Sequence, residues 1–301
     1  MVYKTVFPVF SDEVCQFRVW APQAEVVHLV TEPELTEYAL SPEGFGYWSV
    51  TLHDIYPGTR YKYKINDKDS FPDPASLSQP DGVHEASEVI DVHDFNWSDD
   101  TWEGIPLRKM IQYELHTGTF SAEGNFNGII GKLDYLKFLG INAIELLPVS
   151  QFSGTRNWGY DGVYPFAVHN SYGGAKALMN LVNECHKRGI ALILDVVYNH
   201  FGPEGNYVRN FGSYFSEKYP TPWGEAINFD GPYSDGVRNY VVQNALMWCR
   251  DFHIDALRLD AVHAVFDFSA RHIMQELAEN VEELSSQTGR KYDLIAESHL
   301  N

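Results

Sequence analysis

Near its end the chain contains the stretch Asp255-Ala256-Leu257-Arg258-Leu259-Asp260-Ala261-Val262-His263, which reads as a buried strand with charged side chains at its tip. Side chains alternate between the two faces of a strand, so Arg258 and Asp260 share one face while Leu257 and Leu259 share the other. A neighbouring positive charge keeps a carboxyl group ionised. An ionised, oriented carboxylate is what a covalent nucleophile requires.

Two other apolar stretches end in polar side chains in the same way. Leu294-Ile295-Ala296-Glu297-Ser298 delivers Glu297, and the stretch 191–200 is apolar and then ends in Asp, Asn and His. Any one of these strand ends is often only structural. Three of them, separated by helical segments, are hard to explain by packing. Two carboxylates at the tips of successive parallel strands, Asp260 and Glu297, match the acid and nucleophile of glycoside hydrolysis.

The charge balance limits the partners. The 301 residues include 41 acidic and 22 basic side chains, a net charge of -19. This excess of negative charge argues against nucleic acid or an anionic membrane as a partner. We interpret the acidity as a contribution to solubility, and neutral sugars are compatible with it. Nothing in the sequence determines the oligomeric state.

The cysteines and the N-terminal residues bear on the cellular compartment of the protein. Cys15, Cys185 and Cys249 are widely spaced and odd in number, and no CxxC motif or Cys/His cluster suggests a metal. Residues 1–4 lack the apolar region of a signal peptide, and no apolar run is long enough to span a bilayer. We therefore predict a reduced, cytoplasmic setting, no metal and no cofactor.

Residues 1–95 are predicted to form an all-β, immunoglobulin-like sandwich. Four segments alternate or are rich in β-branched and aromatic residues, with turn residues between them: 15–20, 26–30, 47–52 and 61–65. The Pro/Asp/Ser-rich stretch 71–82 is expected to be an ordered loop or linker. Because a sandwich core is local, we expect limited proteolysis to leave a stable piece ending within residues 71–102.

In residues 96–301 predicted strands alternate with predicted helices, a pattern that indicates a parallel sheet. The expected strands are 110–116, 142–148 and the three described above, and the expected helices cover 128–139, 178–185, 237–252 and 273–284. Polar strand tips favour a (β/α)8 TIM barrel. A doubly wound sheet would also bind ligands at the carboxyl ends of its strands. No glycine-rich phosphate loop follows the first strand, which makes a nucleotide-binding sheet of this kind the less favoured alternative. Five strands make an incomplete barrel, so we expect the N-terminal part of a longer protein that is inactive by itself.

Three motifs together resemble the α-amylase family of glycoside hydrolases (family thirteen). They are Asp195-Val-Val-Tyr-Asn199-His200, Arg258-Leu-Asp260-Ala-Val-His263 and Ala296-Glu297-Ser298. The resemblance implies that Asp260 is the nucleophile, Glu297 the general acid/base and Arg258 the partner of Asp260. It implies that Asp195 and His200 line the subsite next to the cleaved bond. The family's fourth motif, which supplies a third carboxylate, has no counterpart before the chain ends.

Further stretches resemble one branch of this family. The segment 157–164 includes Trp158-Gly-Tyr160-Asp161, which resembles the segment whose tyrosine stacks on the sugar, and 17–22 resembles the sandwich that precedes the barrel in branching enzymes. With 201–207, 221–230 and 297–301, these stretches resemble members that hydrolyse the α-1,4 bond next to the terminal trehalose unit of malto-oligosyltrehalose. The resemblance implies an α-glucan substrate of this kind and the release of trehalose.

Several other side chains are candidates for substrate contacts. Trp223 is the first choice among the aromatics of 201–233, and His263, like His200, is expected to contact sugar hydroxyls. Trp158 is expected to bind substrate, and His116 is equally compatible with a structural role. Glu114 and Glu145 are predicted to be buried structural carboxylates. Asn199 matches a calcium-binding position of some relatives, but no Asp cluster supports a metal there.

Two other functions stay open. A branching transferase would use the same chemistry with a sugar hydroxyl in place of water. A non-catalytic glucan-binding fragment would rely on the sandwich alone. The segment Trp223-Gly-Glu-Ala-Ile-Asn-Phe-Asp230 favours the hydrolase, because it resembles the trehalose-releasing members rather than the transferases.

Overall fold

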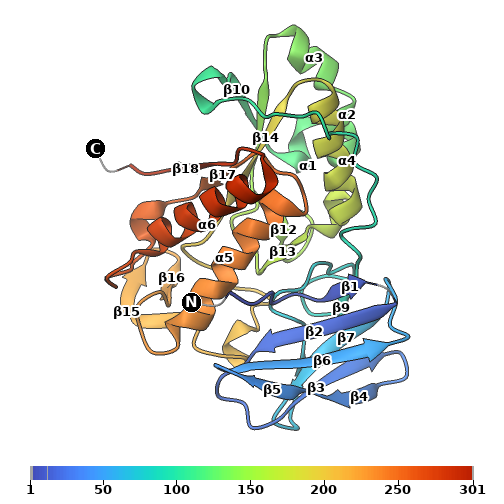
Figure 1. Cartoon of the computed structure of the whole chain (residues 1–301), viewed down its shortest axis with the longest axis vertical. Coiled ribbons are helices and arrows are strands. Elements are labelled where there is room, and N and C mark those ends of the chain that lie inside the picture. The colour runs from blue at the N-terminus through green and yellow to red at the C-terminus, as the bar shows by residue number, and fades with distance from the viewer. Residues whose placement is uncertain (1–2, 12, 300–301) are drawn as a thin grey trace.

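The computed structural model describes residues 3–11 and 13–299, and it has a β-sandwich at one end and an α/β part at the other (Figure 1). One antiparallel sheet has the order β1-β2-β6-β5, and the other has the order β4-β3-β7-β8 with β9 also paired to β7. The strands are β1 (Val9–Ser11), β2 (Val14–Trp20), β3 (Val27–Glu32), β4 (Thr36–Ala39), β5 (Ser41–Gly44), β6 (Tyr47–His53), β7 (Arg60–Ile65), β8 (Ser70–Phe71) and β9 (Ser87–Glu88). The four predicted strands are confirmed as β2, β3, β6 and β7.

The sandwich forms because its strands bury every second side chain. In β2 the side chains of Cys15, Phe17 and Val19 are buried, while the residues between them are partly exposed. In β7 Tyr61 and Tyr63 are buried in the same alternation. Phe17 and Tyr61 pack edge to face with ring centroids 5.0 Å apart, which joins the two sheets. Burial of an apolar side chain such as that of Phe17 or Val19 contributes about 1.5–3 kcal/mol of transfer free energy.

The α/β part is built on a five-stranded parallel sheet. Its strands are β10 (Gln112–Leu115), β11 (Ala143–Leu146), β14 (Ala191–Val196), β17 (Ala256–Leu259) and β18 (Asp293–Ala296), and they lie side by side in chain order. This sequential order is that of a (β/α)8 barrel, whereas a doubly wound sheet reverses its order. Within residues 3–11 and 13–299, β10 and β18 have no further strand beside them. The prediction of an incomplete barrel with five strands is confirmed.

Helices connect the strands of this sheet. They are α1 (Thr117–Phe120), α2 (Phe126–Ile130), α3 (Leu133–Phe138), α4 (Gly174–Lys187), α5 (Ser234–Arg250) and α6 (Ile273–Thr288), with 3-10 turns at Leu107–Lys109, Asn170–Tyr172, Val208–Asn210 and Val262–Ala264. Two hairpins project from the loops, β12 (Ser150–Gln151) with β13 (Tyr164–Val168) and β15 (Phe215–Thr221) with β16 (Gly224–Ile227). Across the described ranges no helix is long and apolar enough to cross a membrane.

Two details differ from the sequence-based predictions. The helix expected over 128–139 is divided into α2 and α3 at Gly131, because glycine weakens helix formation. Glu114 was predicted to be buried, but it is exposed, since β10 is an edge strand of the open sheet. Glu145, which was also expected to be buried, lies on the neighbouring strand β11 and is only partly buried, and burial raises its pKa.

The sandwich and the α/β part share one continuous hydrophobic core, so the core of the sandwich is not local as expected. Trp20 packs on Gly236 at the start of α5, where a Cβ atom would lie 2.0 Å from the indole ring. Its ring also meets Tyr214 edge to face at 5.3 Å. Nearby, Asn239 Nδ2 donates to Tyr47 Oη at 2.8 Å. The sandwich therefore depends on α5 for part of its burial.

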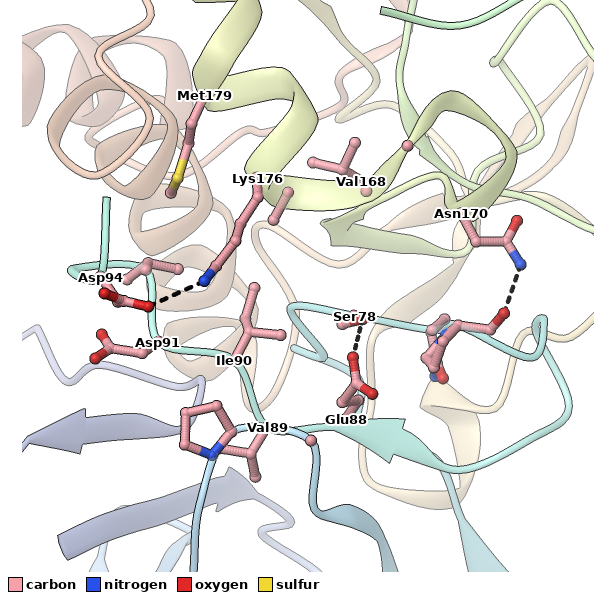
Figure 2. Close-up of a pocket in the computed structure, with 18 residues that line it drawn as sticks. Ser78, Glu88, Val89, Ile90, Asp91, Asp94, Val168, Asn170, Lys176 and Met179 are labelled. Carbon is pink, nitrogen blue, oxygen red and sulfur yellow. Dashed lines mark hydrogen bonds and ion pairs between the residues drawn. The ribbon is translucent and has the colours of Figure 1, made fainter. Parts of the chain in front are cut away.

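A second contact between the two parts surrounds a pocket of about 490 Å³. Its walls come from the 78–94 segment and the start of α4 (Figure 2). Lys176 of α4 pairs with Asp94 at 3.0 Å, and Asn170 Nδ2 donates to the carbonyl of Pro80 at 2.9 Å. The stretch 71–82 is thus an ordered loop held between the sandwich and the barrel.

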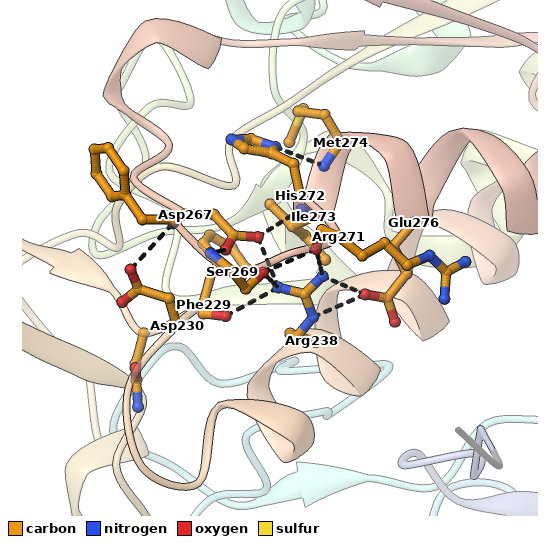
Figure 3. A network of polar contacts seen from close by, with 12 residues as sticks. Phe229, Asp230, Arg238, Asp267, Ser269, Arg271, His272, Ile273, Met274 and Glu276 are labelled. Carbon is orange, nitrogen blue, oxygen red and sulfur yellow. Dashed lines mark hydrogen bonds and ion pairs between the residues drawn. The ribbon is translucent and has the colours of Figure 1, made fainter.

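Arg238 of α5 fixes the loops that follow β14 and β17 (Figure 3). Its buried guanidinium donates to Asp267 Oδ2 at 2.6 Å and to the carbonyl of Phe229 at 2.9 Å. It also donates to Glu276 of α6 at 2.7 Å and to the carbonyl of Arg271 at 2.6 Å. One cation therefore joins α5, α6 and the two loops at the carboxyl end of the sheet.

Candidate active site

The hydrogen-bond ladder of the sheet brings three polar strand tips together. Asp195 on β14 is directly opposite Arg258 on β17. Beyond the regular pairing, Asp260 N donates to the carbonyl of Val196 at 3.0 Å, and Glu297 N donates to that of Leu259 at 3.0 Å. The apolar strands thus place Asp195, Asp260 and Glu297 at one edge of the sheet.

Arg258 is the cation at the centre of this edge. Its Nη1 donates to Asp260 Oδ1 at 2.8 Å and to Asp195 Oδ2 at 2.9 Å. Its Nη2 is 3.7 Å from Glu297 Oε2, and its Nε is 3.9 Å from Glu145 Oε1. Burial opposes the charge of the guanidinium, but the carboxylates raise the pKa of Arg258 overall. A single guanidinium therefore faces four carboxylates.

The Asp260 carboxylate is held through both oxygens. Oδ1 accepts from Arg258, and Oδ2 accepts from Asn199 Nδ2 at 2.9 Å. The same Asn199 nitrogen donates to the backbone carbonyl of Asp260 at 2.8 Å. The Asp260 side chain is 14% exposed, so it is oriented and still reachable. Sequence reasoning missed this role of Asn199, although its place just after β14 was a usable signal.

The turn after Asp260 connects it to Glu297. Ala261 adopts φ +42°, a left-handed conformation that is uncommon for a residue with a side chain. This turn directs Ala261 N at Glu297 Oε2, to which it donates at 2.8 Å. Strained backbone of this kind persists where the surrounding structure enforces it, and it is frequent at functional sites. The two predicted catalytic carboxylates are thus linked through one backbone amide and one guanidinium.

Asp195 is the most buried carboxylate of the cluster, with 1% of its side chain exposed. Oδ2 accepts from Tyr160 Oη at 2.9 Å as well as from Arg258. Oδ1 is buried and has no hydrogen-bond partner among the residues that the structure describes. Burial raises the pKa of Asp195 to about 7, although Arg258 and Tyr160 lower it. The free oxygen is available to a hydroxyl donor.

Trp223 and His200 form one wall of the site. Their rings stack with centroids 5.2 Å apart and an interplanar angle of 17°. Trp223 lies between β15 and β16 and is 48% exposed, so one part of its ring packs on His200 and another part is free. His200 Nδ1 contacts Asn199 Oδ1, and burial lowers the pKa of His200.

His116 braces the loop that carries Trp158. His116 Nε2 lies 2.8 Å from the carbonyl of Asn157 and 3.0 Å from Tyr172 Oη. Its ring centroid is 5.2 Å from that of Trp158, which is exposed. The protein groups around its ring nitrogens give His116 a structural role and leave Trp158 open to a ligand.

His263 lies beyond Asp260 and faces His299. The two rings meet edge to face at 3.9 Å, and within the described part of the chain His263 Nδ1 is buried without a hydrogen-bond partner. His299 was not singled out from the sequence. Its contact with His263 depends on the chain that follows β18, which local pattern does not reveal.

No group of three or more His, Cys, Asp or Glu side chains in residues 3–11 and 13–299 is arranged to hold a metal ion. The side chain of Asn199 contacts Asp260 and His200. The expectations of no metal and no cofactor stay predictions.

Comparison with known proteins identifies the family. Residues 71–222 match the family described as alpha amylase, catalytic domain. Residues 8–86 match carbohydrate-binding module 48, the isoamylase N-terminal domain. The chain belongs to the alpha-amylase family. The two matches overlap in the segment that lies between the sandwich and the barrel, so the boundary predicted at residue 95 stays a prediction.

Curated relatives in this family carry one recurring name. The chain is 49% identical over 293 residues to malto-oligosyltrehalose trehalohydrolase of Saccharolobus solfataricus and 48% identical over 290 residues to that of Arthrobacter ramosus. It is 29% identical to a 1,4-alpha-glucan branching enzyme of Pseudoalteromonas atlantica. The first two alignments cover 97% and 95% of this chain but 50% of each relative. The chain thus spans about half the length of these relatives.

Solved structures agree with the fold. A candidate alpha amylase from Salmonella typhimurium superimposes with a TM-score of 0.93 at 36% identity, and the match covers 99% of this chain and 50% of that one. A pullulanase from Paenibacillus barengoltzii gives a TM-score of 0.80 at 23% identity, covering 93% of this chain and 51% of that one. The second similarity supports the fold alone.

Proposed function

We propose that the whole protein is a retaining glycoside hydrolase that cleaves the α-1,4 bond next to the terminal trehalose unit of malto-oligosyltrehalose. The observation that carries the proposal is the contact of Arg258 with both Asp260 and Glu297 at adjacent strand tips. Retaining glycosidases need two carboxyl groups close enough to act on the two sides of one glycosidic bond.

In this mechanism Asp260 attacks the anomeric carbon of the glucan. Glu297 gives its proton to the oxygen that leaves with trehalose, so the C–O bond breaks as the sugar–Asp260 ester forms. In the second step Glu297 takes a proton from water, the hydroxide attacks the anomeric carbon, and the ester to Asp260 breaks. Arg258 and Asn199 suit this role because they fix both Asp260 oxygens without covering the carboxylate.

The remaining site residues are proposed to bind the sugar beside the cleaved bond. Asp195 offers its unpartnered Oδ1 to a hydroxyl, and Tyr160, which donates to the other oxygen, presents its ring to the sugar face. His200 and His263 are the candidate hydroxyl contacts. Trp158 and Trp223 each expose ring surface.

The proposal that the substrate ends in a trehalose unit is supported by the names of the relatives. Seven curated relatives that are 38–49% identical to this chain bear the name malto-oligosyltrehalose trehalohydrolase. The branching enzyme is more distant, at 29% identity. We infer a neutral α-glucan as partner and a reducing, cytoplasmic setting. The second inference is supported by Cys15, Cys185 and Cys249, which are buried as free thiols.

A product assay tests this function. The whole protein is incubated with malto-oligosyltrehalose and, separately, with maltooligosaccharides of matched length, and the products are separated by chromatography. We expect trehalose from the first substrate and little change in the second. New α-1,6 branches would identify the transferase. Absence of both products, with binding of glucan retained, would identify a glucan-binding protein.

The 301-residue chain by itself is proposed to be inactive. Among the described residues its sheet is open at β10 and β18, and Glu297 stands at the β18 edge. Apolar side chains on the β10 side, including Ile111, Tyr113 and Phe138, are exposed. Open strand edges and exposed apolar surface favour association. Trehalose release by the isolated 301-residue chain would contradict this proposal.

A further inference from the structure

A second pocket lies where the sandwich meets the start of α5, and it shares no residue with the candidate active site. Its volume is about 570 Å³, within the range of small-ligand sites. It is lined by Lys4, Glu43, Phe45, Tyr47, Asp235, Gly236 and Asn239. We propose that this pocket is a non-catalytic binding site for an α-glucan chain.

Phe45 is the feature that calls for a ligand. Its side chain is 92% exposed, the most exposed of the large apolar residues in the described ranges. Its backbone is nevertheless fixed, because its carbonyl accepts from Trp20 Nε1 at 3.3 Å and the next residue's carbonyl accepts from Ala21 N at 2.8 Å. Gly44 and Gly46 on either side have φ values of +82° and +81°, which makes a tight turn. A rigid turn thus presents a bare aromatic ring to solvent.

The polar groups of the pocket suit a neutral polyol. Lys4 pairs with Glu43 at 2.8 Å, and Arg18 also binds Glu43, so the charges of this wall are compensated. Asp235 at the start of α5 is exposed, and its carboxylate makes no hydrogen bond or ion pair with any described residue. A free carboxylate accepts hydrogen bonds from hydroxyl groups and repels phosphates. A nucleic acid is therefore a poor fit.

The occupant is an α-glucan rather than another apolar ligand for two reasons. A glucose ring offers a C–H face to an aromatic ring and hydroxyl groups at its edge, which matches Phe45 beside Asp235. The sandwich that carries Phe45 matches a carbohydrate-binding module over residues 8–86. The pocket shown in Figure 2 has no aromatic side chain in its lining, so it offers a sugar no such surface.

Affinity electrophoresis tests the site. The full chain is run through native gels that contain increasing amylopectin, and the apparent dissociation constant is taken from the retardation. We expect Phe45→Ala to raise this constant at least about tenfold, which corresponds to about 1.4 kcal/mol. Phe45→Trp is expected to retain binding, because it keeps a ring at the same turn. Asp235→Ala is expected to weaken binding by a smaller factor.

Leu35→Ala is the matched control. Leu35 is also exposed, at 64%, also has a positive φ, of +55°, and lies on another turn of the sandwich outside the pocket. Its replacement should leave retardation unchanged. Trp223→Ala separates the candidate active site from the new one. If Trp223→Ala abolishes retardation and Phe45→Ala does not, the proposal is wrong.

Self-association is the other outcome that would overturn the proposal. Sedimentation velocity without glucan distinguishes it, since a dimer that Phe45→Ala dissolves would assign the ring to a protein interface. The hydrolysis of a short malto-oligosyltrehalose by the whole protein is expected to be the same with and without Phe45→Ala. The test therefore does not depend on the activity proposed above, which is measured separately.

Discussion

Arg258 Nη1 lies 2.8 Å from Asp260 Oδ1 while it also contacts Asp195, so one nitrogen orients two acidic side chains from neighbouring strands. The alternation of β17 places Arg258 and Asp260 on the same face, and the parallel register places Asp195 opposite the arginine. The arrangement holds the Asp260 carboxylate in a fixed orientation at the carboxyl end of the sheet.

Replacing Arg258 by leucine should therefore damage both stability and turnover. Asp195 is buried with its charge compensated by Arg258, and removing one partner of a buried pair costs about 3–5 kcal/mol. We expect a lower denaturant midpoint and loss of most activity in the whole protein, with Arg258→Lys less affected. Arg271→Leu, which breaks an exposed pair with Glu279, is the control and should cost less than about 1 kcal/mol. Equal stability of the two leucine variants would contradict the role of Arg258.

Asn199 is predicted to act by positioning Asp260. Asn199→Leu keeps the approximate volume but removes the donor to Asp260 Oδ2. Because small misplacements of reacting groups reduce rates strongly, we expect kcat to fall roughly 10²-fold with a smaller change in KM. Asn210→Leu, at an exposed position before the β15–β16 hairpin, serves as the control. A change in KM alone would instead assign Asn199 to substrate binding.

Asp73 should make stability depend on pH. It is fully buried, accepts from Tyr61 Oη and Ala75 N at 2.8 Å each, and burial raises its pKa to about 7. In the unfolded chain it ionises near its ordinary pKa of about 3.9. The contribution of Asp73 to the free energy of unfolding is therefore complete below about pH 4. It is lost as pH rises through about 7, and it amounts to roughly 1.4 kcal/mol per unit of pKa difference.

Asp73→Asn should remove this dependence. We expect the difference between the two free energies of unfolding, variant minus unmodified chain, to increase by up to about 4 kcal/mol between pH 4 and pH 8. Urea titrations at several pH values measure the difference. For Asp54→Asn, at an exposed position of the sandwich, the free energy of unfolding should change with pH as it does for the unmodified chain. If the free energies of unfolding of Asp73→Asn and the unmodified chain changed with pH in the same way, Asp73 would have the same pKa in the folded and unfolded chain, and the prediction would be wrong.

Gly236 should control the coupling of the sandwich to the barrel. A methyl group there would meet Trp20 at 2.0 Å, so Gly236→Ala forces the two parts to separate. We expect one cooperative thermal transition for the unmodified chain, and a lower midpoint or two transitions for the variant. Gly131→Ala, where the nearest atom is 3.6 Å away, meets no such clash and should not lower the midpoint. A stable proteolytic sandwich ending within residues 71–102 of the unmodified chain would contradict this coupling.

The sequence was informative where local pattern determines structure. The sequence of β17, with Arg258 inside the strand and Asp260 directly after it, was sufficient to place Arg258 beside Asp260, because side chains alternate between the faces of a strand. The role of Asn199 was missed because its partner Asp260 is 61 residues away. Gly236 was missed for the same reason, since only tertiary packing brings Trp20 against it. The exposure of Glu114 depends on whether another strand pairs with β10, which its own sequence does not encode.

The central claim is that Asp260 is the nucleophile of a retaining hydrolase. The most direct test incubates the whole protein with a fluorinated α-glucosyl fluoride that forms the glycosyl ester but hydrolyses slowly, followed by peptide mass spectrometry. We predict one sugar attached to Asp260 and none in an Asp260→Asn variant that keeps its fold. A sugar attached to Glu297 or Asp195, or no adduct together with release of the inverted anomer, would contradict the account.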